Sequence, residues 1–307
     1  MFGLKQVFKR MREAGEAWGD VLSINQRNLS YIYPRNQRRH FPLADNKLKT
    51  KGVLAQHGVP VPKTYLVYDS FYGMSQLSQD LAPHNEFVIK PASGRGGGGI
   101  IVIAQRRGDR WISVGGTQYS EEQLRKHISD ILFGVYSFDL NDQAIVEERL
   151  KQHDQITRLS PYGLADVRVV VCDHQPVLSM IRLATQASRG TANLHQGAVG
   201  MGVDMETGIT RHAIHDGRAI QQHPDSGQSL IGAQIPYWDN ILEIAQTVAH
   251  TVPLKYLGID IALESSGPKV LEINVRPGIE IQNANMLGLR GLLEDLSPLG
   301  AEGGDRE

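Results

Sequence analysis

The sequence has a single cysteine, Cys172, among its 307 residues. One thiol forms neither a disulfide within the chain nor a cysteine-based zinc site, so both kinds of framework are excluded. This scarcity of cysteine is compatible with a reducing compartment. The sequence also lacks any run of about 18 apolar residues, which excludes a membrane-spanning helix.

The sequence also has almost no net charge and few aromatic residues. The formal net charge is −1, and aromatic residues make up 7% of the chain. Proteins that bind nucleic acid commonly present a basic field and aromatic rings on which bases stack. We therefore expect no nucleic-acid partner. Hydrophobic residues at 41% and charged residues at 21% are ordinary for a folded protein, so disorder as the main state is excluded.

The beginning of the chain is locally basic. Residues 1–40 hold eight Lys or Arg and three Asp or Glu, a local charge of +5. Leu4, Val7, Phe8 and Met11 fall on one face of a helix, and the basic residues fall largely on the other. Charges interrupt every apolar run, which excludes a secretory signal. Two interpretations stay open: a helix packed on its own domain, or a basic amphipathic helix that docks on a membrane surface or a protein partner.

The order of strand and helix patterns predicts an α+β protein with antiparallel sheets. Helices are expected at 46–57, 120–133 and 237–252, and short strands at 64–68, 87–90, 100–104 and 144–146. Hairpins are expected from 166–172 with 176–183 and from 257–263 with 270–275. Strands in hairpins with helices between them argue against a doubly wound parallel sheet.

A glycine-rich segment follows the strand that ends in Lys90. Five of the seven residues from Ser93 to Gly99 are glycine. Glycine lets backbone N–H groups approach phosphate oxygens without a Cβ in the way. No Gly-Lys-Ser/Thr ends the segment and no helix follows it, so it is neither a P-loop nor a dinucleotide fingerprint. A phosphate-binding loop and a plain hairpin loop are equally compatible with this pattern.

Acidic and amide side chains alternate on the predicted hairpin near the end of the chain. Glu272 and Asn274 are two apart on one strand, so their side chains face the same side. Asp260 on the preceding strand is able to face them across the hairpin. Three oxygen ligands suit Mg²⁺, which also takes oxygens from phosphates. With Arg276 close by, this spacing favours a metal site over a solvent-facing polar stripe.

Arginines and polar residues gather in the predicted hairpin at 166–183 and just after it. Asp166 and Arg168 open one strand, Arg182 ends its partner, and Asn193 and His195 follow. Arginine forks bind carboxylates and phosphates with two hydrogen bonds. Each arginine alone is more often part of a surface ion pair, and the histidine alone favours a hydrogen-bonded structural role.

An acidic pair follows the strand predicted at 144–146. Glu147 and Glu148 begin this stretch, and Leu150 ends it. Backbone groups at the end of such a strand are able to pair with the edge of an adenine ring. The pattern alone does not separate this role from that of an ordinary strand end.

In this order the motifs resemble the ATP-grasp superfamily from about Asp45 to about Gly288. The ribosomal-protein α-L-glutamate ligase group is similar at Asp45-Asn-Lys47, Gly58-Val-Pro-Val-Pro62, Lys90-Pro91, the glycine loop, Asp166-Val-Arg168, Asn193-Leu-His195-Gln-Gly197, Gly258-Ile-Asp260 and Glu272-Ile-Asn274-Val-Arg-Pro-Gly278. The α-L-glutamate ligase-like and sugar-transfer-associated ATP-grasp groups are similar at His223-Pro-Asp-Ser-Gly227, Gly232, Ile235-Pro236 and Trp238-Asp239.

The resemblance implies an ATP-grasp fold, in which two α+β subdomains with antiparallel sheets clamp ATP. About 45 residues precede Lys47, so we expect a reduced N-terminal pre-grasp domain. The expected division is a helical, basic extension at 1–45, a subdomain with the glycine loop at 46–143, a subdomain with the metal site at 144–296 and a flexible tail at 297–307.

The resemblance also implies roles for single residues. Lys47, Lys90 and the loop residues Ser93, Gly94, Gly96, Gly97 and Gly98 would contact ATP. Lys47 is preferred over Lys49 and Lys51, because it follows the Asp-Asn pair. Glu147, Glu148 and Leu150 would border the adenine, with Glu148 and Asp166 near the adenosine. Asp260, Glu272 and Asn274 would hold Mg²⁺, with Mn²⁺ as an alternative. Arg168, Arg182, Asn193 and Arg276 would line the phosphate and the acyl substrate.

The activity implied is that of a cytoplasmic, ATP-dependent carboxylate–amine ligase that works through an acylphosphate. It would add an amino acid such as glutamate to an amine on a small molecule, a peptide or a protein tail. No set of nucleophilic Ser-His-Asp or Cys-His residues is found, and this reaction needs none. Thr191 stands where the glutamate ligases carry an arginine, so their substrate recognition is not carried over.

Two alternatives stay open at this point. One is a ligase for a glycan- or lipid-linked acceptor, peripheral at the inner membrane face, which the basic N-terminal segment would serve. The other is a nucleotide-binding regulatory protein without ligase activity, which the complete metal-ligand set argues against. The resemblance is also compatible with a homo-oligomer, but the sequence does not determine the oligomeric state.

Overall fold

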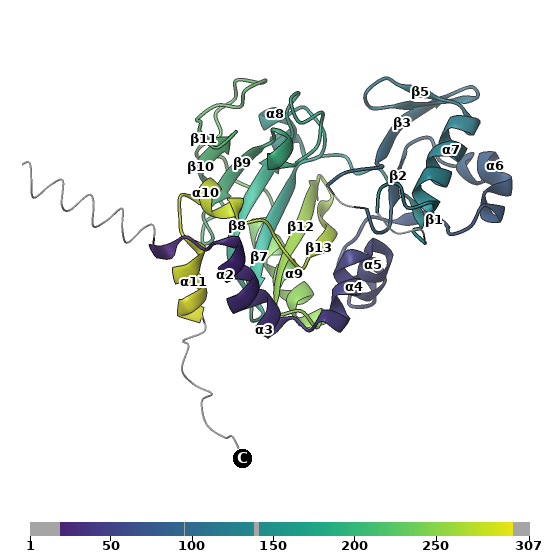
Figure 1. The fold of residues 1–307 in the computed structure, drawn as a ribbon. Helices are drawn as coiled ribbons and strands as arrows, with labels where there is room; N and C mark the ends of the chain where they lie inside the picture. Colours follow the sequence, from purple (N-terminus) through teal and green to yellow (C-terminus); the bar gives the residue numbers. More distant parts are fainter. Residues whose placement is uncertain (1–18, 95, 138–140, 297–307) are drawn as a thin grey trace, which may run out of the picture. The chain divides into compact units, whose positions relative to one another are not determined.

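The computed structural model describes residues 19–94, 96–137 and 141–296. The predicted basic N-terminal helix and the predicted tail lie outside the described residues. The described chain forms two compact units (Figure 1). Residues 42–151 and 269–272 make the six-stranded unit, and residues 19–41, 152–268 and 273–296 make the seven-stranded unit.

The six-stranded unit is an antiparallel sheet with strand order β1-β6-β2-β3-β4-β5. Its strands are β1 (Thr64–Tyr68), β2 (Phe87–Pro91), β3 (Ile101–Arg107), β4 (Arg110–Ser113), β5 (Gln118–Tyr119) and β6 (Ala144–Glu147). Its helices are α4 (Phe41–Asp45), α5 (Lys47–Gln56), η3 (Tyr72–Gln76), α6 (Leu77–Leu81) and α7 (Glu121–Leu132).

A helix packs on this sheet because its apolar residues recur on one face. Helix α7 lies against β2 and β6, and α6 lies beside it (Figure 1). Leu124 and Ile128 of α7 pack in one buried cluster with Phe87 and Ile89 of β2. Ser120 begins the helix with a capping box, in which its hydroxyl and the Gln123 side chain satisfy backbone N–H groups.

The seven-stranded unit has strand order β11-β10-β9-β8-β7-β12-β13. Its strands are β7 (Asp166–Cys172), β8 (Gln175–Leu183), β9 (Val199–Val203), β10 (Thr210–His215), β11 (Arg218–Ala219), β12 (Tyr256–Glu264) and β13 (Gly267–Asn274). Its helices are α2 (Ile24–Gln26), the π-helical η1 (Arg27–Ile32), α3 (Tyr33–Arg35), η2 (Arg38–His40), α8 (Asp154–Leu159), η4 (Leu194–Gln196), α9 (Trp238–Thr251), α10 (Glu280–Asn285) and α11 (Leu289–Leu296).

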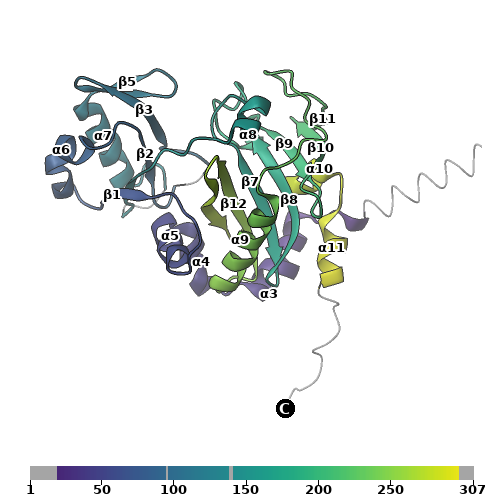
Figure 2. The ribbon, with the colours of Figure 1, turned by 180° about the vertical axis from the view of Figure 1, so that it is seen from behind.

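Helices cover both faces of this sheet. Helix α9 packs on β7, β8 and β12, and α10 packs on β8, β9 and β10. The two opposite views place α9 on one face and α10 on the other (Figures 1 and 2). The segment before α4 belongs to this unit, because the Asn36 amide oxygen accepts the N–H groups of Lys255 and Tyr256 at 2.9 and 3.1 Å.

The predicted α+β class with antiparallel sheets is confirmed, and so are the predicted helices at 46–57, 120–133 and 237–252 and both hairpins. The short strands β4, β5, β9, β10 and β11 are not foreseen from the sequence. Glycines interrupt β9, and β5 and β11 are two residues long. Strand β6 lies between β1 and β2, so the compact units divide after residue 151, whereas the expected division lies at 143.

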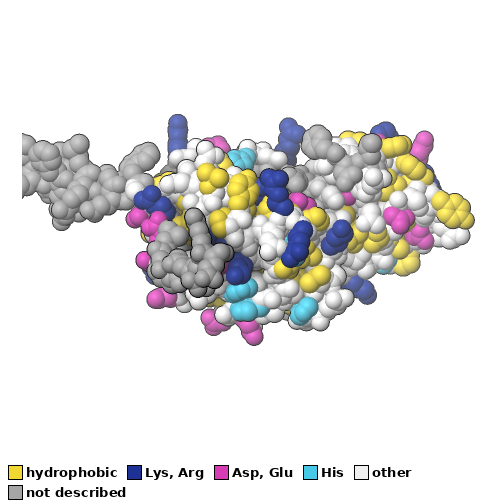
Figure 3. All heavy atoms as spheres, turned by 60° about the horizontal axis from the view of Figure 1, so that its bottom comes forward, with side chains coloured by type: hydrophobic (Ala, Val, Ile, Leu, Met, Phe, Trp, Pro, Cys, Tyr) yellow, Lys and Arg dark blue, Asp and Glu magenta, His cyan; other side chains and the backbone are white. Residues whose placement is uncertain are grey.

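Charge is dispersed on the face of the molecule drawn in Figure 3. Among the described side chains on that face, Lys and Arg (dark blue) lie scattered between uncharged and hydrophobic ones. Within the described part of the chain, no helix has the length and apolar character needed to cross a membrane.

Candidate active site

Three lysines and one glutamate form a buried group in the six-stranded unit. Lys47 and Lys51 are one turn apart on α5, so they project from the same face of the helix. Lys51 Nζ lies 2.5 Å from Glu147 Oε2, and Lys90 on β2 forms an ion pair with the other oxygen of Glu147. Strands β2 and β6 pair directly, which brings Lys90 and Glu147 together.

Burial governs the charge of this group. Burial raises the pKa of Glu147, but Lys90 and Lys51 outweigh that effect and lower it. Burial lowers the pKa of Lys51 and that of Lys47, while Glu147 and Glu272 respectively oppose the change. A negatively charged ligand beside these ammonium groups would be stabilised strongly, because little water screens them.

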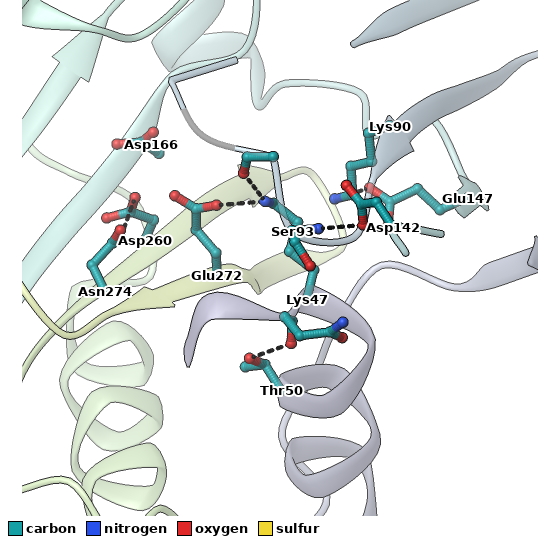
Figure 4. A network of polar contacts seen from close by, with 12 residues as sticks. Lys47, Thr50, Lys90, Ser93, Asp142, Glu147, Asp166, Asp260, Glu272 and Asn274 are labelled. Atoms are coloured by element: carbon teal, nitrogen blue, oxygen red, sulfur yellow. Dashed lines mark hydrogen bonds and ion pairs between the residues drawn. The ribbon is translucent and has the colours of Figure 1, made fainter. Parts of the chain in front are cut away.

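Lys47 contacts the beginning of the glycine loop. Its backbone N–H donates to Ala92 O at 2.9 Å, and its Nζ donates to Gly94 O at 2.7 Å (Figure 4). Glu272 Oε2 lies 3.5 Å from the same Nζ. Lys49 is exposed, and Lys51 is bound to Glu147. The preference for Lys47 as the lysine that contacts ATP stays a prediction.

A buried carboxylate holds the start of the glycine loop. Asp142 Oδ1 accepts the backbone N–H groups of Ser93 at 3.0 Å and Gln143 at 2.8 Å (Figure 4). Asp142 is 4% exposed, and its Oδ2 has no hydrogen-bond partner among the residues that the structure describes. Close packing also requires glycine here, because a Cβ on Gly94 would lie 2.2 Å from Pro91 Cγ.

A histidine holds the other end of the loop. His127 on α7 contacts Gly99 O through Nε2 at 2.9 Å, and Tyr136 OH lies 3.3 Å from its Nδ1. Burial lowers the pKa of His127, so the ring is neutral at pH 7 and donates from Nε2 to the carbonyl. Gly99 has φ +76°, and a Cβ there would lie 2.6 Å from the Tyr136 ring. The loop is thus attached at both ends to the body of its own unit.

Two acids and two arginines form a second group, on the seven-stranded sheet. Register places Asp260 of β12 opposite Arg168 of β7, and Arg182 of β8 opposite Asp166 of β7. Arg168 binds Asp260 with Nε at 2.7 Å and Nη2 at 2.6 Å. Arg182 binds Asp166 in the same way at 2.6 and 2.7 Å, and its Nη2 also lies 2.8 Å from Asp260.

The four charges neutralise one another inside the unit. Burial alone would raise the pKa of Asp260, but Arg168 and Arg182 outweigh it and lower that pKa. Burial raises the pKa of Asp166 to about 6, against the opposing effect of Arg182. Both carboxylates are therefore ionised at neutral pH, and each arginine is held in one orientation by two parallel hydrogen bonds.

The predicted metal ligands fit a hard cation in their chemistry. Asn274 Nδ2 donates to Asp260 Oδ2 at 3.1 Å, which brings two of the three together as predicted (Figure 4). Within the described part of the chain, Asp260 Oδ1 accepts one hydrogen bond, from Arg168, which leaves a lone pair for a cation. Within the described residues, no three His, Cys, Asp or Glu side chains gather as a metal cage. A cation here would thus also need phosphate oxygens.

The remaining predicted residues lie in varied surroundings. Glu148 Oε1 accepts from Lys63 N at 2.7 Å and from Lys269 Nζ at 2.6 Å, and Leu150 is half-buried. The exposed Arg276 guanidinium lies over the Phe41 ring, 5.2 Å from its centroid.

Asn193 begins η4 as its cap, and its Oδ1 accepts His195 N at 3.0 Å. The His195 side chain is 75% exposed, and its Nε2 lies 3.5 Å from Glu280 Oε1. The roles assigned from the sequence to the site residues stay predictions.

Sequence reasoning missed several residues of these groups. Asp142, His127 and Tyr136 are far from the glycine loop in sequence and carry no motif. Arg27 is 6% exposed, and its Nη1 donates to Pro277 O at 2.6 Å, which ties η1 to the segment after β13. The sequence offered one signal for the buried group: Lys51 is a second lysine one helical turn after Lys47, on the same face of the helix.

Comparison with known proteins finds a family and several relatives. The profile of the sugar-transfer associated ATP-grasp family matches residues 26–297. The chain is 24% identical over 272 residues to a probable alpha-L-glutamate ligase of Cellvibrio japonicus (strain Ueda107), across 88% of this chain and 68% of that protein. It is 24% identical over 258 residues to ribosomal protein bS6–L-glutamate ligase of Shigella boydii serotype 4 (strain Sb227), across 84% and 64%. The chain thus spans about two thirds of the length of these relatives.

Solved structures of ATP-grasp proteins are also similar to the chain, with lower sequence identity. The ATP-grasp ligase PsnB, complexed with a minimal precursor, matches with a TM-score of 0.46 and 17% identity, across 85% of this chain and 62% of that chain. A RimK domain ATP-grasp protein from Sphaerobacter thermophilus matches with a TM-score of 0.46 and 11% identity, across 85% and 69%.

Proposed function

The chain belongs to the sugar-transfer associated ATP-grasp family, and we propose that it is an ATP-dependent ligase that joins a carboxylate to an amine. The match to this family confirms the resemblance that the motifs predicted. The relatives named alpha-L-glutamate ligase and ribosomal protein bS6–L-glutamate ligase support an amino acid such as glutamate as one substrate.

The observation that carries the proposal is the buried ammonium groups beside the glycine loop. Lys47 contacts Gly94 O, and Lys90 shares Glu147 with Lys51. Burial lowers the pKa of Lys47, which marks an ammonium group that lacks sufficient negative charge around it. The triphosphate of ATP would supply that charge, and the glycine loop would supply backbone N–H groups.

The reaction needs positioning and charge neutralisation more than covalent help from the protein. A carboxylate oxygen attacks the γ-phosphorus of ATP, the bond from that phosphorus to the bridging oxygen breaks, and ADP leaves. The amine nitrogen then attacks the acyl carbon, the acyl carbon–oxygen bond breaks, and phosphate leaves with the loss of one amine proton. In our proposal Lys47 and Lys90 bind the phosphates, and Arg168 and Arg182 orient the acyl group.

Asp260, Glu272 and Asn274 would hold Mg²⁺, or Mn²⁺ in its place. Such an ion neutralises charge on phosphates as the γ-group transfers. Arg168 and Arg182 keep Asp260 ionised and fixed, so that its remaining lone pair is available at neutral pH. Glu272 is 34% exposed at its side chain and is therefore accessible to a ligand.

The experiment is an incubation of the protein with ATP, Mg²⁺ and a pool of twenty amino acids. A coupled assay reads ADP, and mass spectrometry reads new amides. The variant is Glu272→Gln, and the matched control is Glu243→Gln, an exposed glutamate on α9. We expect ADP and one amide with the native protein and the control. A loss of about 10²-fold is expected in Glu272→Gln or with EDTA, the size seen for one lost transition-state contact.

The outcomes separate the ligase from its alternatives. ADP that depends on Glu272 and on one amino acid would establish the ligase and identify its carboxylate. Binding of ATP with no ADP under any mixture would favour the regulatory alternative. If the native protein bound no ATP, the proposed function would be wrong.

A second candidate is a ligase whose amine acceptor is attached to a glycan. The description of the family as sugar-transfer associated favours it. The same assay with amino sugars in place of free amino acids as acceptors tests it, because a product mass that contains the sugar appears only in this case. Cytoplasmic and membrane-surface locations, protein partners and a homo-oligomer stay predictions.

A further inference from the structure

An exposed histidine and an acid form a pair in the seven-stranded unit that the proposed function does not use. His195 Nε2 lies 3.5 Å from Glu280 Oε1. The His195 side chain is 75% exposed and that of Glu280 is 32% exposed, so a ligand is able to reach both. His195 lies on η4, and Glu280 is the first residue of α10.

The turn that carries His195 is held rigidly. Asn193 Oδ1 accepts His195 N at 3.0 Å, and Thr191 Oγ1 donates to Gln196 Oε1 at 2.7 Å. The fully buried Thr185 donates its hydroxyl to Gly197 O at 2.7 Å. Three side chains therefore fix the backbone on both sides of an imidazole that faces solvent. Such support is typical of a residue whose position matters more than its burial.

Glu280 favours one tautomer of His195. A carboxylate next to Nε2 favours the tautomer with the proton on that nitrogen, which leaves the lone pair on Nδ1. This is the arrangement in which an acid orients an imidazole that acts as a base. The separation of 3.5 Å is long for a hydrogen bond, as is common for catalytic pairs without a ligand.

Glu280 lies next to Gly278 and near one arginine of the buried group. A Cβ on Gly278 would lie 2.6 Å from Glu280 Oε2 and 4.0 Å from Arg168 Nη1. Arg168 uses Nε and Nη2 on Asp260, and its Nη1 lies near this glycine. The charge of Arg27 also interacts with Glu280. The acid of the pair thus lies near the guanidinium that our proposed function places at the acyl group.

We propose that His195, oriented by Glu280, accepts the proton that the acceptor ammonium group must lose before its nitrogen attacks the acyl phosphate. This inference rests on the ligase function proposed above. The first proton moves from the ammonium group to His195 Nδ1 and then to water. The neutral amine nitrogen forms a bond to the acyl carbon, the acyl carbon–oxygen bond to phosphate breaks, and the second amine proton leaves with the phosphate. Glu280 is the positioning residue, and the substrate class is a primary amine that is protonated in solution.

The test compares two small amines as acceptors, with ATP, Mg²⁺ and the pool of twenty amino acids as donors. Hydroxylamine is uncharged at neutral pH, so it needs no base to become a nucleophile, whereas methylamine is protonated. The variants are His195→Ala and Glu280→Gln. The control is His212→Ala, an exposed histidine on β10 of the same unit. Thermal unfolding of each variant shows whether it is folded.

In His195→Ala we expect hydroxamate to form within about twofold of the native rate. The methylamide should form about 10² to 10⁴-fold more slowly, the usual contribution of a general base. In this variant the methylamide rate should rise about tenfold per pH unit, because the free-amine fraction does so below the pKa of the amine. Glu280→Gln should also lower the rate of methylamide formation relative to that of hydroxamate formation. His212→Ala should leave this ratio of rates unchanged.

Three results would overturn the proposal. The first is methylamide formation at the native rate in folded His195→Ala. The second is an equal loss of hydroxamate and methylamide, which would assign His195 to donor activation. The third is the absence of both ADP and hydroxamate with the native protein. Only the third also removes the proposed ligase function, so the two failures are distinguishable.

Discussion

Arg168 and Asp260 face each other across the paired strands β7 and β12 and share two hydrogen bonds, from Nε at 2.7 Å and from Nη2 at 2.6 Å. Asp260 is 2% exposed at its side chain and Arg168 is 11% exposed. Two charges are thus removed from water together, and their pairing, with Arg182 as a second partner of Asp260, stabilises them there. The same contact leaves Arg168 Nη1 near Gly278.

Replacement of this acid is the first prediction. Asp260→Asn keeps the shape of the side chain but leaves Arg168 and Arg182 without one of their two counter-charges. We expect a loss of about 3–5 kcal/mol in the free energy of unfolding, the usual cost of breaking a buried ion pair. Urea denaturation measures it. Asp109→Asn, at an exposed residue, should change stability by less than about 0.5 kcal/mol. Equal stability of the two variants would contradict the buried pairing.

The second prediction concerns Glu147 and its dependence on pH. Two lysines lower the pKa of Glu147 below its ordinary value of 4.5. A carboxyl group whose pKa is lowered on folding stabilises the protein above its unfolded pKa, and this is lost as pH falls through the folded pKa. Glu147→Gln should therefore be less stable than the native protein at pH 7 by a few kcal/mol. Below pH 4.5 this difference should shrink.

Urea denaturation between pH 7 and pH 3.5 checks this dependence. Glu122→Gln is the control, because Glu122 is exposed in the first turn of α7. The control should track the native protein at every pH. A difference for Glu147→Gln that stays constant down to pH 3.5 would show that Glu147 does not pair with the lysines.

The third prediction separates backbone strain from a side-chain clash at the end of the glycine loop. Gly99 and Gly108 both have positive φ, at +76° and +61°. Alanine at either position should lower the free energy of unfolding by about 1–2 kcal/mol, because the backbone there is left-handed. Only at Gly99 would the new Cβ meet a ring, 2.6 Å from Tyr136. Gly99→Ala should therefore be the less stable variant and should bind ATP several-fold more weakly, as measured by calorimetry.

A double variant is the check on the cause. Gly99→Ala combined with Tyr136→Ala should recover part of the ATP affinity, because the clash is removed. If Gly99→Ala and Gly108→Ala bound ATP equally well, the end of the loop would have no part in nucleotide binding.

The fourth prediction is acid sensitivity from a buried histidine. His223 is 1% exposed; its Nε2 lies 3.2 Å from Ala184 O, and its Nδ1 accepts the N–H groups of Asp225 and Ser226 at 3.3 Å. Burial lowers the pKa of His223 from 6.5, and the contact with Ala184 O opposes this. The neutral ring thus stabilises the fold above pH 6.5. Below that pH stability should fall, by at most about 1.4 kcal/mol per pH unit for one proton.

Denaturant midpoints at pH 7.5, 6.5, 5.5 and 5.0 measure this effect. The variant His223→Gln should be less stable at pH 7.5, because it alters the hydrogen bonds of the buried ring. Glutamine does not titrate, so the variant should lack the part of the decline in stability below pH 6.5 that comes from His223. Parallel pH curves for the native protein and the variant would assign the acid sensitivity to other groups.

Much of the fold is readable from local patterns. The helix at Lys47–Gln56 is signalled by Asn46 before it and Gly58 after it, and the helix at Glu121–Leu132 by Ser120. Asp260, Glu272 and Asn274 are likewise visible, because strand periodicity puts alternate side chains on one side. The family match then agrees with what these motifs predict.

The sequence by itself determined the helix boundaries, the hairpins and the kinds of side chain near the site, since these depend on neighbours within a few residues. Only the tertiary structure decided which charges meet. Glu147 binds Lys51 across 96 positions and Asp260 binds Arg168 across 92. Those pairings follow from strand order and register, and a shift by one residue would turn each side chain to the opposite face of its sheet.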